Sequence, residues 1–113
     1  MENYLGKMKE FLNMDSELPY NEFAEYFQDF IGYLNANYDK FDQDSIIKAR
    51  FIASILNVNS EDRARRKGAE AKKYKKISEK SKFWTDAINY RLRKEGMTQE
   101  QIDQANSAIS DSM

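Results

Sequence analysis

The sequence predicts an all-α protein, a compact helical bundle of four main helices plus a short C-terminal helix. Apolar residues recur at helical spacing along the whole chain, and no stretch shows the strict alternation of a half-buried strand. One proline and four glycines leave few places for breaks. The chain has 113 residues, of which 41% are hydrophobic, and this fits a single domain over residues 1–113 with one core.

The first two helices are predicted from apolar stripes. The stripe of a short first helix consists of Tyr4, Leu5, Met8, Phe11 and Leu12. Polar residues at 15–17 and a proline at 19 predict the break that follows it. A second helix, from about residue 19 or 21 to residue 37, places five apolar residues on one face: Phe23, Phe27, Phe30, Ile31 and Leu34. Its tyrosines point toward a different face: Tyr20, Tyr26 and Tyr33.

A third helix is predicted to begin with Asp44 or Ser45 as its N-cap. Its apolar residues spread round much of the helix, which is typical of the buried centre of a bundle. They are Ile46, Ile47, Phe51, Ile52, Ala53, Ile55, Leu56 and Val58. Residues 1–60 therefore form the part of the domain that carries most of the predicted core.

A long basic helix over about residues 61–95 follows, with Ser60 as its N-cap and Gly96 after its end. A bend at Ser78 or Ser81 would divide it into two shorter helices. Its second half is expected to dock on the core through Tyr74, Ile77, Phe83, Trp84, Ala87, Ile88 and Leu92. Its first half offers only small residues between charges, so that half either packs very closely or projects into solvent.

The last helix is short and covers residues 98–110. Thr98 and Gln101 have the spacing of a capping box, and the apolar residues that follow recur at helical intervals.

The charge is distributed very unevenly along the chain. Residues 63–94 contain thirteen of the eighteen basic residues and three acidic ones, which gives a local net charge of +10. Residues 1–62 have a net charge of −7 and residues 95–113 one of −4, so the total is only −1. Such an asymmetry suggests an anionic partner for the basic segment.

Basic residues also align on one side of the predicted long helix. On a helical wheel four of them fall in one row, at positions 66, 73, 76 and 80. A row of this kind matches the phosphates of DNA or RNA, because lysine and arginine gain affinity by releasing condensed counterions. The candidate nucleic-acid-binding residues are Arg63, Arg65, Arg66, Lys67, Lys72, Lys73, Lys76 and Lys80.

Two other interpretations of this row stay open. It is a solvated helix face, or it neutralises the acidic row Glu22, Glu25 and Asp29 of the second helix, in the same chain or in another copy. A helix-turn-helix is a further alternative, because residues 51–60 resemble the first helix and turn of that motif. That motif is disfavoured, because Arg63 and Arg66 occupy positions that should anchor its second helix in the core.

The sequence contains no histidine and no cysteine, and no catalytic or cofactor motif appears. We therefore expect a protein that is not an enzyme and needs no cofactor. Asp39, Asp42 and Asp44 crowd one loop without the glycine and glutamate of a calcium-binding loop, so a helix-capping role is expected for them. No apolar run is long enough for a membrane span, and we expect a soluble cytoplasmic protein.

The sequence thus predicts a non-enzymatic nucleic-acid-binding accessory or regulatory protein. The alternative is a protein-interaction module or inhibitor that docks on a larger protein, for example a small accessory protein of a phage or mobile element. Tyrosines are frequent in protein interfaces, and those expected at the surface are Tyr20, Tyr26, Tyr33, Tyr38 and Tyr90.

Overall fold

The structure is a computed structural model that describes residues 1–66 and 68–112. Every regular element in these residues is helical. The elements are α1 (Glu2–Leu12), α2 (Tyr20–Asn37), the short 3-10 helix η1 (Tyr38–Lys40), α3 (Gln43–Arg65), α4 (Ala71–Lys94) and α5 (Gln99–Asp111). The predicted all-α fold is therefore confirmed.

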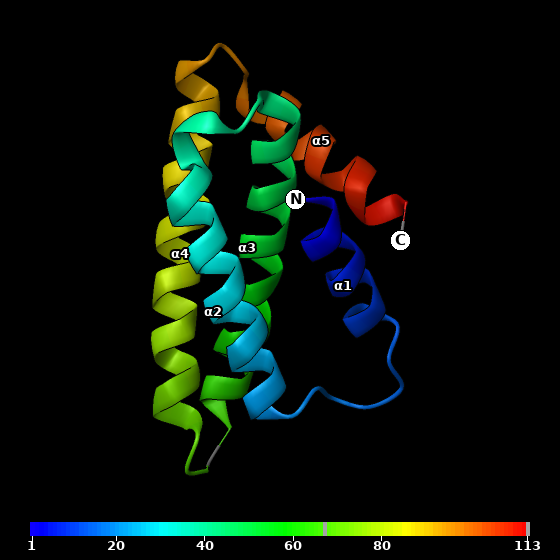
Figure 1. Cartoon of the computed structure of the whole chain (residues 1–113), viewed down its shortest axis with the longest axis vertical. Coiled ribbons are helices and arrows are strands. Elements are labelled where there is room, and N and C mark those ends of the chain that lie inside the picture. The colour runs from blue at the N-terminus through cyan, green and yellow to red at the C-terminus, as the bar shows by residue number, and fades with distance from the viewer. Residues whose placement is uncertain (67, 113) are drawn as a thin grey trace.

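Helix α3 lies at the centre of the bundle, as its widely spread apolar residues predicted. It packs most extensively against α4 and also contacts α1 and α5. Figure 1 shows α2, α3 and α4 running along the long axis, with α1 and α5 on the other side of α3. The bundle measures 43 × 25 × 25 Å.

The core contains all five residues predicted from the apolar face of α2. Tyr26 is also buried, with 7% of its surface exposed, so its assignment to the surface was wrong. The reason is that α1 covers this side of α2: the Tyr26 hydroxyl donates a hydrogen bond to the backbone oxygen of Tyr4 at 2.8 Å. Burial raises the pKa of Tyr26 well above its ordinary value.

The N-cap of α3 is Asp42, two residues before the first predicted candidate. Its carboxylate accepts a hydrogen bond from the backbone N–H of Ser45 at 2.8 Å. This hydrogen bond favours the ionised form, and it lowers the pKa of Asp42 below its ordinary value. Asp42 thus has the capping role that the sequence indicated for this aspartate-rich loop.

The predicted helix over residues 61–95 was wrong at its start. Helix α3 continues to Arg65, and α4 begins only at Ala71. Ser60 lies inside α3, fully buried, and its hydroxyl donates to the backbone oxygen of Leu56 at 2.6 Å. A serine can form this bond within a helix as well as cap one, and so its presence did not locate the boundary. From Ala71 to Lys94 the helix is continuous, with no break at Ser78 or Ser81.

The same boundary excludes a helix-turn-helix. Residues 57–60, which would form its turn, are helical. Instead, α3 and α4 form an antiparallel helical hairpin, as Figure 1 shows at the lower end of the bundle. The hairpin therefore divides the basic segment between the end of α3 and the whole of α4.

The N-terminal capping box predicted for the C-terminal helix is confirmed. The Thr98 hydroxyl oxygen accepts a hydrogen bond from the backbone N–H of Gln101, and the Gln101 side-chain oxygen accepts one from the backbone N–H of Thr98. Gly96 has a positive φ of 105°, which ends α4 and turns the chain toward α5. Asn89 on α4 then joins α5 to the core, because its side chain accepts from the Nε of Arg50 at 3.1 Å and donates to Gln99 at 2.9 Å.

Candidate nucleic-acid interface

The eight predicted phosphate-binding residues lie in two separate places. Arg63, Arg65 and Arg66 are at the end of α3, whereas four lysines are on the first half of α4: Lys72, Lys73, Lys76 and Lys80. Lys67 lies outside the described residues. The structure therefore separates an arginine group from a lysine group that the sequence had placed on one helix.

Arg63 is a packed residue, which makes it a weak candidate for a phosphate contact. Only 10% of its side chain is exposed, and its guanidinium lies 4.4 Å from the ring centroid of Phe23. Its Nε donates to a Glu17 carboxylate oxygen at 3.1 Å, and another nitrogen donates to the Tyr74 hydroxyl at 3.4 Å. A cation stacked on a ring and bonded to a carboxylate ties α3 to α2, α4 and the loop before α2.

We expect replacement of Arg63 by Ala to lower the free energy of unfolding by about 1–3 kcal/mol, because charged hydrogen bonds and ring contact are lost together. Urea denaturation measures the change. The matched control is Arg65→Ala, which removes an exposed arginine whose only ion pair within the described residues is with Glu61 one turn earlier. An effect below about 1 kcal/mol is expected there. Equal effects of the two substitutions would contradict the packed role of Arg63.

Arg65 and Arg66 are exposed, but each already has a carboxylate partner. Arg65 bonds Glu61 at 2.7 Å, and Arg66 bonds Asp62 at 2.9 Å as well as Glu17. The hydrogen bonds that Arg66 donates to Glu17 and, to a smaller extent, to Asp62 raise the pKa of Arg66 above its ordinary value. A phosphate would have to displace these carboxylates, which makes the two arginines weaker candidates than the sequence suggested.

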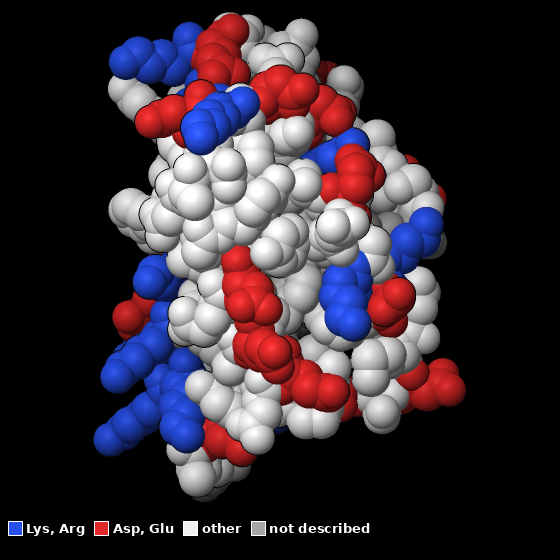
Figure 2. Space-filling view, in the orientation of Figure 1, with Lys and Arg blue, Asp and Glu red and all other residues white. Residues whose placement is uncertain are grey.

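The strongest remaining candidates form a surface that we call the lysine face. It consists of Lys72, Lys73, Lys75, Lys76 and Lys80. Lys75 was not among the eight nucleic-acid-binding residues predicted from the sequence. All five are exposed, and none forms an ion pair with a carboxylate in the described residues. Figure 2 shows basic side chains grouped at the lower left, over the first half of α4.

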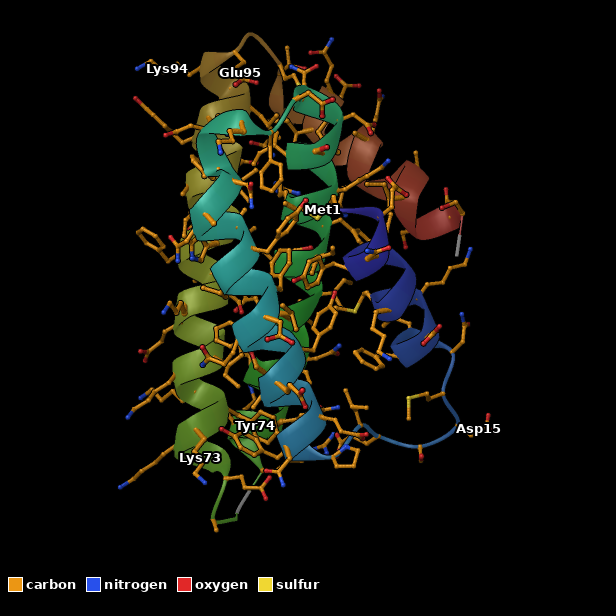
Figure 3. The ribbon with its side chains drawn as sticks, viewed as in Figure 1. Met1, Asp15, Lys73, Tyr74, Lys94 and Glu95 are labelled. Atoms are coloured by element: carbon orange, nitrogen blue, oxygen red, sulfur yellow. The ribbon has the colours of Figure 1, made fainter. Side chains whose placement is uncertain are left out.

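Lys73 illustrates how the face is oriented. Its Nζ lies 5.2 Å from the ring centroid of Tyr20, while the neighbouring Tyr74 is buried in the core. Figure 3 shows these two labelled residues at the lower end of α4. The buried ring at position 74 fixes the rotation of α4, and that rotation turns the lysines outward.

The lysine face does not pair with the acidic row of α2. Glu22, Glu25 and Asp29 are exposed, and no ion pair joins them to the lysines in the described part of the chain. They line a groove of about 350 Å³ between α1 and α2, together with residues that include Tyr4 and Tyr26. Figure 2 shows an acidic row running diagonally, separate from the basic group. Neutralisation within one chain was thus the wrong interpretation.

Two of the three aspartates over residues 39–44 have local structural roles. Asp42 caps α3, and Asp44 forms an ion pair with Lys48 at 2.9 Å. The described residues contain no group of three or more side chains that could hold a metal ion. None of their helices is long and apolar enough to cross a membrane.

One feature of α4 was not predicted from the sequence. Phe83 was expected to broaden the buried face, yet 61% of its surface is exposed. Its position carried the signal, since it lies two helical turns after Lys76 and therefore on the same side. Tyr90, two further turns along, is 66% exposed and confirms the surface position expected for it.

Comparisons of the chain with models of known protein families, with curated proteins and with solved structures found no match.

Proposed function

We propose that this protein binds nucleic acid without catalysis, and that the lysine face of α4 contacts the phosphates. The observation that carries the proposal is the set of five exposed lysines without a carboxylate partner in the described residues. Over Lys72 to Lys80 they extend about 12 Å along the helix. A nucleic-acid strand offers a phosphate about every 3.4 Å, so several contacts fit this length.

The position of these lysines is unfavourable for the isolated protein. Lys72 and Lys73 lie in the first turn of α4, which contains no acidic residue, and the positive end of the helix dipole repels cations there by about 0.3–1 kcal/mol each. Lys72, Lys76 and Lys80 are spaced by four residues, and each such like-charge pair costs about 0.2–0.5 kcal/mol. Binding of a polyanion would reverse both effects, which is why we assign the face to function rather than to stability.

The salt dependence of binding tests this proposal. We expect the protein to bind a labelled mixed-sequence duplex at about 50 mM salt and to lose most of that binding by about 200 mM. With three to five phosphates neutralised, the slope of log K against log salt should be about −3 to −4.5. Fluorescence anisotropy measures both quantities. Absence of binding to duplex and to single strand at the lower salt concentration would refute the proposal.

The alternative function is docking on another protein, and the acidic groove between α1 and α2 favours it. Exposed carboxylates beside tyrosine rings suit a basic segment of a partner. Glu22→Lys together with Glu25→Lys separates the two proposals, because it changes the groove and leaves the lysine face intact. Loss of a protein partner with unchanged nucleic-acid binding would assign the groove to docking.

A further inference from the structure

The two most exposed aromatic side chains of the molecule lie on the same helix as the lysine face. Phe83 and Tyr90, which we call the aromatic pair, are 61% and 66% exposed. All other phenylalanine, tyrosine and tryptophan side chains are buried or half-buried in the described residues. An exposed aromatic residue alone needs no explanation, but two on one helix face suggest a binding surface when they lie beside lysines that have no carboxylate partner in the described residues.

The helix repeat places the aromatic pair in line with the lysines. Lys76, Phe83 and Tyr90 are each seven residues apart, so each step covers two turns and rotates by only about 20°. Lys72 and Lys80 flank the beginning of this line, and Lys94 lies one turn beyond Tyr90. Figure 3 shows Lys94 at the upper end of α4, opposite the end that carries Lys73. A surface of about 33 Å therefore combines lysines with exposed rings, and the acidic residues Glu79 and Asp86 also lie along it.

The rings are held by few contacts of their own. Phe83 meets Trp84 edge to face with 5.7 Å between ring centroids, and the Lys94 Nζ lies 5.9 Å from the Tyr90 centroid. The Tyr90 hydroxyl forms no hydrogen bond to a described residue. Asp86, between the two rings, is already paired with Lys82 at 2.8 Å, which reduces the negative charge at this part of the surface.

We propose that this surface selects single-stranded nucleic acid, whose bases stack on Phe83 and Tyr90 while lysines of α4 contact its phosphates. This inference rests on the proposed function and adds the strand preference to it. The bases of a duplex are stacked on each other and are not available to the rings, whereas those of a single strand are. Stacking on an aromatic ring is tolerant of sequence, so we expect little discrimination among bases.

The test compares one oligonucleotide as single strand and as duplex, in DNA and in RNA, with the double variant Phe83→Ala/Tyr90→Ala. We expect single-strand affinity to fall by about tenfold for each ring removed, with duplex affinity unchanged. The control variant Phe83→Tyr/Tyr90→Phe keeps both rings and should bind the single strand like the wild type. An unchanged melting temperature of the alanine variant shows that it is folded.

Trp84 supplies a second readout that needs no variant. It is the only tryptophan and it touches Phe83, so a base stacked at Phe83 should quench its emission. Single strand should quench the wild-type signal and duplex should not.

The outcomes distinguish the two proposals. If the wild type binds neither form at low salt, the proposed function fails and this inference fails with it. If the wild type binds both forms and the alanine variant loses nothing on the single strand, or loses equally on the duplex, stacking is refuted while the role of the lysines stands. If the alanine variant instead converts a dimer to a monomer in sedimentation, the rings form a contact between copies, and the inference is overturned.

Discussion

Replacement of Phe51 by Ala is expected to lower the free energy of unfolding by about 3–5 kcal/mol. The side chain lies on the central helix α3 and is only 1% exposed, so its removal loses buried apolar area and leaves a cavity. Small domains are stable by only about 5–15 kcal/mol, and the loss is a large fraction of that total. Thermal unfolding followed by circular dichroism should show a decrease in Tm of more than about 10 °C.

Val58 on the same helix provides the control. Its side chain is 62% exposed, although its apolar character had placed it among the core candidates. Val58→Ala should change the stability by less than about 0.5 kcal/mol, since an exposed methyl pair contributes little and alanine favours the helix. If Phe51→Ala melted close to the wild type, or if Val58→Ala were equally harmful, α3 would not be the buried centre of the bundle.

Much of the fold was predictable because several helices contain strong local signals. The five apolar residues on one face of α2 and the capping box of α5 depend on short spacings, and both are confirmed. The break between α3 and α4 was misplaced because serine and acidic residues at 60–62 resemble a helix start. Tertiary packing sets the actual boundary, because Ser60 is buried within α3 and the chain continues as a helix for one more turn to Arg65.

The candidate site was predicted only in part, for a related reason. Charge alone identified the basic segment, but it could not tell Arg63, which is stacked on Phe23, from Lys76, which is exposed. That distinction depends on the rotation of each helix about its axis, which the buried residues fix through tertiary contacts. The same reason explains two wrong expectations. Tyr26 is buried because α1 covers it, whereas Phe83 is exposed because nothing in the described residues covers it.

Three substitutions test whether lysines of α4 bind nucleic acid. Lys72→Glu, Lys76→Glu and Lys80→Glu together should weaken binding to duplex and single strand by at least about 100-fold at low salt, because three phosphate contacts become repulsive. Stability should change little. The three positions are exposed, the like-charge spacing remains as it was, and an acidic residue near the start of α4 is favoured by the helix dipole.

The decisive measurement compares this variant with one of equal net charge, in which Lys7, Lys9 and Lys40 become Glu. These three lysines lie on α1 and η1, outside the lysine face. Anisotropy titrations of both variants on the same oligonucleotide then remove the effect of total charge. We predict a loss of at least about 100-fold for the α4 variant and less than about tenfold for the control. Equal losses, or a folded α4 variant that binds like the wild type, would contradict the assignment of this face to nucleic acid.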